Sequence, residues 1–156
     1  MNICVVLKGL YEDFVILIIY HSPHSSTVNN MNLLQLMKEF VSIKGKKFII
    51  GDFNVPNVDW IFMYPGAGIK SFENKLISCI HDCFLVQHVK QPTRYKDLQK
   101  QNILDLLLTQ DDLIYDISFD VPIGKSDHIV IGFLCKFRNS YADVTNKLDF
   151  SKGNYN

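Results

Sequence analysis

The sequence has no excess of charge of either sign. Its 156 residues include 16 lysines and arginines and 16 aspartates and glutamates, so the formal net charge is zero. A protein that grips nucleic acid through bulk charge carries a positive excess, so the composition argues against that class. It leaves room for a local contact, because one polar stretch carries the basic residues Lys90, Arg94, Lys96 and Lys100. Such a cluster, opposed here only by Asp97, is more often a solvated loop.

A long hydrophobic run is also missing. The longest, near Phe14 to Tyr20, is far too short to span a bilayer, and no membrane partner is expected. The N-terminus lacks a basic flank followed by an apolar core and a small-residue cleavage site, so we see no secretory signal. We therefore expect an intracellular protein, with the nucleus as one candidate compartment. The length and the hydrophobic content of 47% are typical of one folded domain.

Cysteines are few, and their spacing is not that of a zinc site. The four are Cys4, Cys79, Cys83 and Cys135. Without a secretory signal they are expected to be reduced thiols. Cys79 and Cys83 would lie one helical turn apart, but zinc would need two further ligands, and the usual paired spacing is absent.

The hydrophobic pattern predicts one α/β domain over residues 1–137, followed by a polar, linker-like tail over residues 138–156. Strands are expected over residues 3–7, 14–20, 47–51, 84–89, 103–109, 114–120 and 129–137, the first two forming an antiparallel hairpin. Amphipathic helices are expected over residues 29–43 and 71–83. Residues 52–70 form a long loop, which in a compact domain is usually functional or mobile.

The stretch Gly51-Asp52-Phe53-Asn54 places two polar side chains directly after an apolar strand. Gly51 allows the backbone to turn or to pack closely where a side chain would block it. Asp52 and Asn54 are two residues apart, so they point the same way while the chain stays extended. A carboxylate beside a carboxamide can receive a proton or a metal ion and hold a phosphate oxygen. The alternative is an ordinary turn, because aspartate and asparagine are common turn residues.

Polar residues stand within or at the end of other predicted strands: Tyr20, Asp105 and the pair Asp127-His128. Asp105 lies inside the run Ile-Leu-Asp-Leu-Leu-Leu, where a carboxylate is costly to bury unless another group pairs with it. His128 is a natural partner, since a carboxylate can fix the tautomer of an imidazole. The alternative is that Asp105 begins an edge strand and faces water.

Together these motifs resemble, in order and spacing, the endonuclease/exonuclease/phosphatase superfamily, the group of deoxyribonuclease I and the apurinic/apyrimidinic endonucleases. The segments that carry the resemblance are Gly51-Asp52-Phe53-Asn54, Pro92-Thr93-Arg94, Leu104-Asp105-Leu106-Leu107-Leu108-Thr109 and Ser126-Asp127-His128. The nearest likeness is to the endonuclease domains of non-LTR retrotransposons, where a Tyr-x-x-Pro strand end precedes the GDFN-type motif, as Tyr20 to Pro23 does here. The polar tail resembles the linker that leads toward reverse transcriptase in those polyproteins.

The resemblance implies an α/β fold of the deoxyribonuclease I type, a two-layer β-sandwich flanked by helices, with the site at one end of the paired sheets. It also implies hydrolysis of DNA phosphodiesters that depends on Mg²⁺ or Mn²⁺. In the full-length element, reverse transcriptase would be part of the same polyprotein. The residue types suit this chemistry, because Mg²⁺ prefers carboxylate oxygens and the reaction needs charge stabilisation on the phosphoryl oxygens.

By matched position, the resemblance assigns catalytic roles. Asp52 would orient or deprotonate the attacking water, and Asn54 and Tyr20 would hold the scissile phosphate. His128, oriented by Asp105, would contact a phosphate oxygen and stabilise charge.

The remaining matched residues would bind the metal ion and the DNA. Asp127 would lie at or near the metal, together with Asp52. Contacts with DNA would come from Asn54, Thr93, Arg94 and Ser126.

The resemblance does not extend to the first half of the superfamily pattern. That half carries a phosphate-contacting asparagine and the principal metal-binding glutamate, whereas the only glutamate before Tyr20 is Glu12, in a predicted hairpin turn. We therefore expect an N-terminally truncated domain with impaired hydrolysis. The alternatives are a non-catalytic remnant or weak nucleic-acid-binding module and, less favoured, a phosphatase of the same superfamily.

Overall fold

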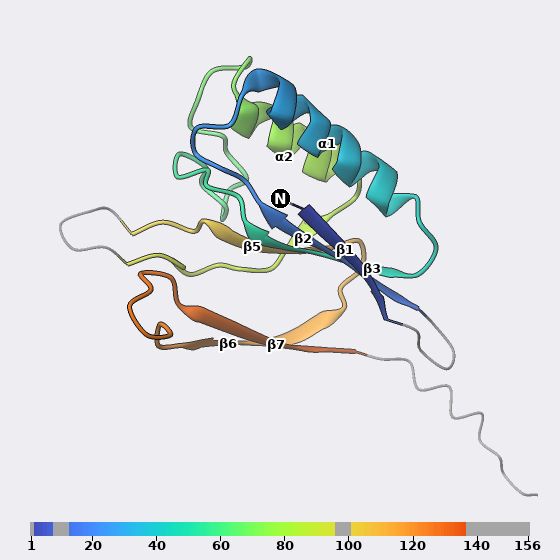
Figure 1. The fold of residues 1–156 in the computed structure, drawn as a ribbon, viewed down its shortest axis with the longest axis vertical. Coiled ribbons are helices and arrows are strands. Elements are labelled where there is room, and N and C mark those ends of the chain that lie inside the picture. Colours follow the sequence, from blue (N-terminus) through green and yellow to red (C-terminus); the bar gives the residue numbers. More distant parts are fainter. Residues whose placement is uncertain (1, 8–12, 96–100, 137–156) are drawn as a thin grey trace, which may run out of the picture.

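The computed structural model describes residues 2–7, 13–95 and 101–136 (Figure 1). Its elements are, in order, strands β1 (Asn2–Leu7) and β2 (Phe14–Tyr20), helix α1 (Thr27–Val41), strand β3 (Lys46–Asp52), helix α2 (Phe72–Asp82), and strands β4 (Val86–Gln87), β5 (Asp105–Thr109), β6 (Ile114–Asp120) and β7 (Val130–Cys135). The predicted tail lies outside the described residues, as do Lys96, Asp97 and Lys100. No helix in the described ranges is long and apolar enough to cross a membrane.

The larger sheet has five strands in the order β1-β2-β3-β5-β4. β2 and β3 run parallel, whereas the other neighbouring strands pair antiparallel, so the predicted hairpin of the first two strands is confirmed. A parallel pair needs a crossover connection, and the amphipathic helix α1 supplies it.

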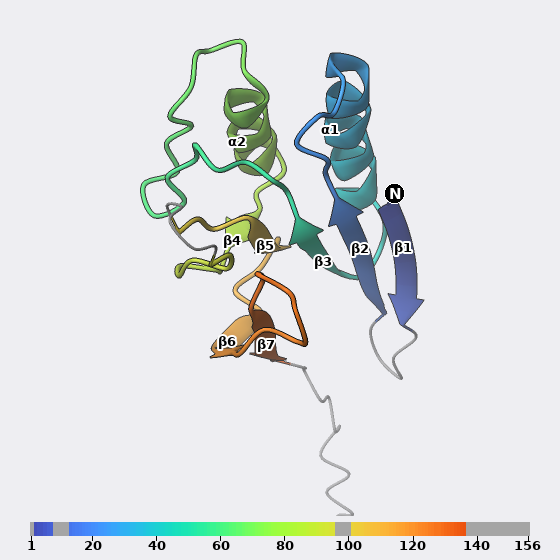
Figure 2. The same cartoon turned by 60° about the vertical axis from the view of Figure 1, so that its left-hand side comes forward.

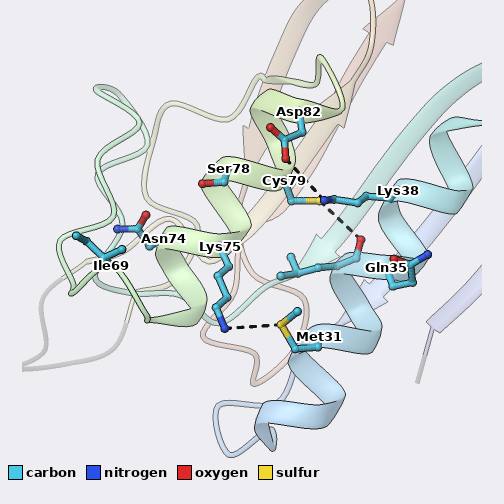
Figure 3. A pocket seen from close by; sticks show the side chains of 10 residues that line it. Met31, Gln35, Lys38, Ile69, Asn74, Lys75, Ser78, Cys79 and Asp82 are labelled. Carbon is cyan, nitrogen blue, oxygen red and sulfur yellow. Dashed lines mark hydrogen bonds and ion pairs between the residues drawn. The ribbon is translucent and has the colours of Figure 1, made fainter.

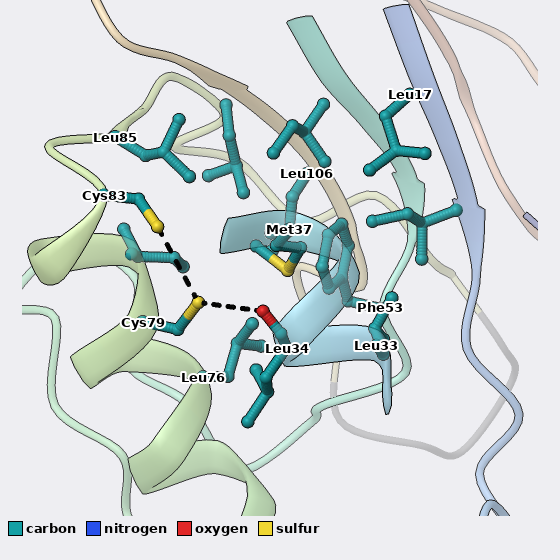
Figure 4. Close-up of a cluster of buried hydrophobic side chains, with 14 of the residues drawn as sticks. Leu17, Leu33, Leu34, Met37, Phe53, Leu76, Cys79, Cys83, Leu85 and Leu106 are labelled. Carbon is teal, nitrogen blue, oxygen red and sulfur yellow. Dashed lines mark hydrogen bonds between the residues drawn. The ribbon is translucent and has the colours of Figure 1, made fainter. Parts of the chain in front are cut away.

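Both helices cover one face of this sheet (Figures 1 and 2). Alternate residues of β2, namely Val15, Leu17 and Ile19, point to this face and are almost fully buried. They pack in one cluster with Met37 of α1 and Leu76 of α2, and Figure 4 shows part of this packing. The buried alternate residues of β2 and the apolar faces of α1 and α2 therefore form one core.

The two neighbouring cysteines belong to this core. The sulfur atoms of Cys79 and Cys83 lie 4.0 Å apart, and both thiols are free (Figure 4). Burial, reinforced by the neighbouring Cys83 thiol, raises the pKa of Cys79 to about 12. A thiol that holds its proton so firmly acts as apolar filling and not as a nucleophile.

A second sheet, formed by β6 and β7, packs against the opposite face (Figure 1). The apolar layer between the sheets includes Phe48 of β3, Leu107 of β5 and Ile114 of β6. Phe133 of β7 stacks on Phe48 with ring centroids 6.1 Å apart. The predicted fold class, an α/β two-layer sandwich with flanking helices, is confirmed.

Strand β5 begins at Asp105, two residues later than predicted. The reason is that the backbone N–H groups of Leu104 and Asp105 both donate to Oγ1 of Thr93, each over 3.0 Å. Asp105 therefore opens the strand and does not lie in its middle. Because β5 lies between β3 and β4, the edge-strand alternative is wrong.

The strand predicted over residues 84–89 is reduced to the two residues of β4. Phe84 has a positive φ of 53°, so the chain leaves α2 through a left-handed turn. The side chain of Gln87 bonds both the N–H and the carbonyl of Val89, where a sheet partner would otherwise be needed. Helix α1 begins earlier than predicted, because the Ser26 side chain caps its first turn.

Candidate active site

Three polar side chains form a row across the sheet where β2 and β3 end. The strand register pairs Tyr20 with Asp52 across β2 and β3, and Asp52 with Asp105 across β3 and β5. Paired residues on neighbouring strands point to the same face, so all three side chains lie on the face that carries the second sheet. Separate sequence motifs thus converge on one end of the two sheets.

The Asp52–Asn54 motif is a turn and does not stay extended, because Asn54 has a φ of 46°. Oδ1 of Asp52 accepts the Asn54 backbone N–H over 3.0 Å, and Oδ2 accepts the Asn54 side-chain amide over 2.9 Å. The same amide donates to the backbone oxygen of His21 over 3.1 Å. The structure confirms the ordinary turn, and this turn holds both side chains at the end of the sheets.

Burial raises the pKa of Asp52 above its ordinary value, against the opposing effect of the Asn54 backbone N–H. The neighbouring Asp105 adds to the rise, whereas His128 and Arg94 oppose it. Burial acts in this direction because it disfavours the charged form of a carboxyl group. A carboxylate with a raised pKa accepts a proton more readily, and such groups are frequent at functional sites.

Asp105 holds His128 through a hydrogen bond of 2.8 Å between Oδ2 and Nδ1. This contact confirms the predicted pairing. The two side chains are 22% and 27% exposed, so the pair is mostly shielded from water. A carboxylate at Nδ1 orients the ring and leaves Nε2 as the nitrogen that can meet a substrate.

Thr93 supports this pair from behind. Its side chain is fully buried, and its hydroxyl holds the backbone at the start of β5. Its carbonyl accepts the N–H of Ile129 over 3.0 Å, directly after His128. A fully buried side chain does not reach a ligand, so the structure places Thr93 behind the site and not on its surface.

Arg94 and Asp127 form an ion pair beside the site, with 2.7 Å between Nε and Oδ2. The hydrogen bond from Arg94 holds the pKa of Asp127 below its ordinary value. Oδ1 of Asp127 lies 4.0 Å from Nε2 of His128. The exposed Ser126 accepts the backbone N–H of His128 over 3.0 Å, which shapes the turn before β7.

Within the described ranges, one group of side chains could hold a metal ion. Asp52, Asp105 and His128 each offer a ligand atom, and these atoms lie within 4.8 Å of one another. Carboxylate oxygens suit Mg²⁺ and Mn²⁺. Asp127, the other residue expected at the metal, lies outside this group and is engaged by Arg94.

The model of the family described as endonuclease-reverse transcriptase matches residues 14–132. This span covers most of the chain and contains every site residue named above. The chain belongs to this family. It is therefore a retrotransposon-endonuclease-like member of the endonuclease/exonuclease/phosphatase superfamily. Among curated proteins, none matches the sequence.

Solved structures share the fold of this family member. The endonuclease domain of TRAS1, a telomere-specific non-LTR retrotransposon, has a TM-score of 0.65 and 17% identity, over 86% of this chain and 61% of that one. The 3′ phosphatase NExo from Neisseria, bound to a product DNA hairpin, has a TM-score of 0.58 and 14% identity, over 80% and 62%. A family protein from Leptotrichia buccalis has a TM-score of 0.54 and 15% identity, over 87% and 54%. The chain thus has a deoxyribonuclease I-like fold and spans less than two thirds of the length of these structures.

In this endonuclease-reverse transcriptase family member, Tyr20 lies on the open side of the site. It is 56% exposed. It lines a hollow of about 380 Å³ together with Ser22, Ser25 and Asn29 near the start of α1. Neither Asp52 nor His128 lines this hollow, so the ability of the phenol to meet a ligand at the site rests on its exposure and on its register opposite Asp52.

His21 is a neighbour of the site that no sequence motif points to. It is almost fully buried, and both of its ring nitrogens are hydrogen bonded. Its backbone and side chain contact the turn that carries Asp52 and Asn54. Burial sets it apart from the exposed His24 nearby, and burial depends on how the helices pack.

A separate hollow of about 390 Å³ lies between α1 and α2 (Figure 3). Lys38 and Asp82 form an ion pair of 3.7 Å there, and Lys75 reaches the sulfur of Met31. None of the residues that line it belongs to the row at the strand ends. The candidate active site is therefore the cluster around Asp52.

Proposed function

We propose that this chain hydrolyses phosphodiester bonds of DNA with Mg²⁺ or Mn²⁺, as a retrotransposon-type endonuclease. The observation that carries the proposal is the convergence of two bonded pairs, Asp52 with Asn54 and Asp105 with His128, at one end of the sheets. They offer a proton acceptor, an amide donor and an imidazole in one place. In-line displacement at phosphorus relies on positioning and charge stabilisation by such groups.

Each side chain has a distinct task in this proposal. Asp52 orients or deprotonates the attacking water, and its raised pKa supports that task because a base works best when its pKa approaches the pH of the reaction. Asn54 and the exposed Tyr20 hold the scissile phosphate. His128, oriented at Nδ1 by Asp105, presents Nε2 to a phosphate oxygen and stabilises the developing charge.

The donor set fits a divalent ion that prefers oxygen ligands. Asp52 is the first ligand in this proposal, with Asp105 beside it. Asp127, which lies outside that group, would be the further carboxylate only if it gave up its ion pair with Arg94. When bound, Mg²⁺ or Mn²⁺ would polarise the phosphate and neutralise part of its charge.

DNA contacts come from residues that flank the site. Arg94 and Ser126 line the approach to His128 and can contact phosphate oxygens, whereas Thr93 acts by holding the backbone behind them. A DNA substrate also favours a nuclear location and, in the full-length element, reverse transcriptase in the same polyprotein.

Nicking of supercoiled DNA in the presence of Mg²⁺ tests the proposal. His128→Ala is expected to lower the rate by about 100-fold or more, because a donor that stabilises charge in the transition state is lost. The matched control is His81→Ala, which removes an exposed histidine on α2 and should leave the rate unchanged. Activity that survives in His128→Ala would remove His128 from the mechanism.

Nucleic-acid binding without catalysis is the second candidate function. The carboxylates of Asp52, Asp105 and Asp127 already have protein partners, and a metal ion would have to compete with these bonds. A site that holds no metal ion could still bind DNA without cleaving it. Retarded migration of DNA on a gel, with no cleavage by the wild type, would support it. A substrate that carries a DNA 3′-phosphate belongs in the same assay, and its hydrolysis without nicking would indicate a phosphatase.

A further inference from the structure

We infer that His21 is a positioning residue whose imidazole holds the Phe53 carbonyl and thereby orients Asp52 and Asn54. The consequence for catalysis rests on the proposed function, whereas the positioning itself can be measured without a substrate. His21 contributes no atom to the row at the strand ends. It acts from behind, in the layer between the sheet and the helices.

His21 touches each residue of the turn. Its backbone N–H donates to the Asp52 carbonyl over 2.8 Å, and its own carbonyl accepts the Asn54 side-chain amide over 3.1 Å. Any residue at this position could make these two backbone bonds. The third bond, 2.9 Å between Nδ1 and the Phe53 carbonyl, needs a side-chain donor. A carbonyl only accepts, so Nδ1 carries the proton.

The imidazole is anchored on both helices. Nε2 lies 2.8 Å from the Asn30 side-chain amide on α1. With the proton of a neutral ring on Nδ1, Nε2 accepts, so this contact is a hydrogen bond when Asn30 turns its amide nitrogen toward the ring. The ring stacks on Phe72, the first residue of α2, with centroids 4.4 Å apart and planes 19° from parallel. Only 7% of His21 is exposed. A ring held on two sides and at both nitrogens keeps the donor aimed at one carbonyl.

The hydrogen bond to the Phe53 carbonyl connects the imidazole of His21 to the site. The peptide plane between Phe53 and Asn54 sets the direction of the Asn54 amide, and Asn54 has a φ of 46°, which few residues other than glycine adopt. A bond that fixes this plane opposes relaxation to an ordinary backbone conformation. The backbone N–H and the side-chain amide of Asn54 both donate to the carboxylate of Asp52, so the position of Asn54 also fixes the orientation of this carboxylate.

Three substitutions separate the two bonds of the imidazole. His21→Asn places an amide nitrogen near the position of Nδ1 and can keep the bond to the Phe53 carbonyl. His21→Gln places it near Nε2 and can keep only the bond to Asn30. His21→Phe keeps a ring on Phe72 and loses both bonds. The control is His24→Phe, because His24 is exposed.

Two measurements on the full chain follow. Amide hydrogen exchange of Asn54, read by NMR, is expected to be about tenfold faster or more in His21→Gln and His21→Phe, and near wild type in His21→Asn and His24→Phe. The amide of Leu108, which lies opposite Ile49 in the pairing of β5 with β3, should stay equally protected in all variants. For nicking in Mg²⁺, kcat should fall about tenfold or more in His21→Gln and His21→Phe, with little change in KM. In His21→Asn, kcat should stay near the wild-type value.

Wild-type protection of the Asn54 amide in a folded His21→Phe or His21→Gln would overturn the inference. If His21→Phe does not fold, the comparison of His21→Asn with His21→Gln decides, and equal or reversed protection would also overturn it. A wild type that cleaves no DNA would count against the proposed function alone, because the exchange ranking needs no substrate.

Discussion

Asp52 shows, at the scale of one residue, how a site can oppose stability. Its carboxyl is half-buried, and burial raises its pKa. The folded state therefore binds a proton at Asp52 more readily than the unfolded state does. The stability that comes from this protonation is present below the ordinary pKa of aspartate and is lost as the pH rises through the raised pKa. At neutral pH the carboxylate of Asp52 is ionised although it is partly shielded from water, which lowers the stability of the folded state.

Asp52→Asn is accordingly expected to increase the free energy of unfolding at neutral pH by less than about 1 kcal/mol, a small gain because water still reaches the group. The gain should shrink as the pH falls through the raised pKa, where the wild-type carboxyl becomes neutral. Hydrolysis should be lost. Urea unfolding at neutral and acidic pH measures the difference, with Asp120→Asn, at an exposed residue of β6, as the control. A variant less stable than wild type at neutral pH would show that the Asn54 bonds outweigh the desolvation.

Strand β5 shows, at the scale of an element, how a distant side chain sets a boundary. Thr93 lies eleven residues before Leu104, yet its hydroxyl accepts the two N–H groups at the start of β5. The same residue holds the chain after His128 through its carbonyl. The position of the Asp105–His128 pair therefore depends on one buried threonine.

Thr93→Val keeps the shape of the side chain but leaves a buried and a partly buried N–H group without an acceptor. Since each such group costs about 1–3 kcal/mol, we expect a loss of roughly 2–6 kcal/mol in the free energy of unfolding, toward the lower end because the Asp105 N–H is only partly buried. Thr93→Ser keeps the hydroxyl and should lose much less. Urea unfolding compares the two variants, and a valine variant as stable as the serine variant would contradict the role given to the hydroxyl.

At the scale of the whole molecule, the fold brings together three carboxylates that already have partners. Asp52 is bonded by an asparagine, Asp105 by a histidine and Asp127 by an arginine. Mg²⁺ usually needs one or two well-placed carboxylates and keeps several waters. An ion entering this site must compete with the existing bonds of each carboxylate.

We therefore expect Mg²⁺ to bind with millimolar affinity or weaker, which corresponds to about 4 kcal/mol or less. Titration calorimetry, or the shift in melting temperature on adding Mg²⁺, measures it, and Asp120→Ala should leave the result unchanged. Micromolar binding that Asp52→Ala abolishes would contradict this expectation. It would show that a complete site exists and that a further ligand, such as Glu12 or Glu73, takes part.

The sequence by itself determined the features that depend on near neighbours. The strands predicted over residues 14–20 and 114–120 are confirmed at both ends, because a continuous apolar run in the first and an alternating pattern in the second are local properties. Gly51 was expected where a side chain would block close packing, and a Cβ there would collide with the Ile19 carbonyl of the neighbouring strand. The motifs that carry the family resemblance are likewise runs of adjacent residues.

Only the tertiary structure decided which polar groups meet and which are covered. Asp105 and His128 are 23 residues apart, and the pairing predicted from their chemistry needed the two sheets to close. Arg94 engages Asp127 across 33 residues, and the imidazole of His21 is buried by two helices that follow it in the chain. Register and packing bring such groups together, and they depend on the whole chain, whereas a sequence pattern reports only what lies within a turn or a strand.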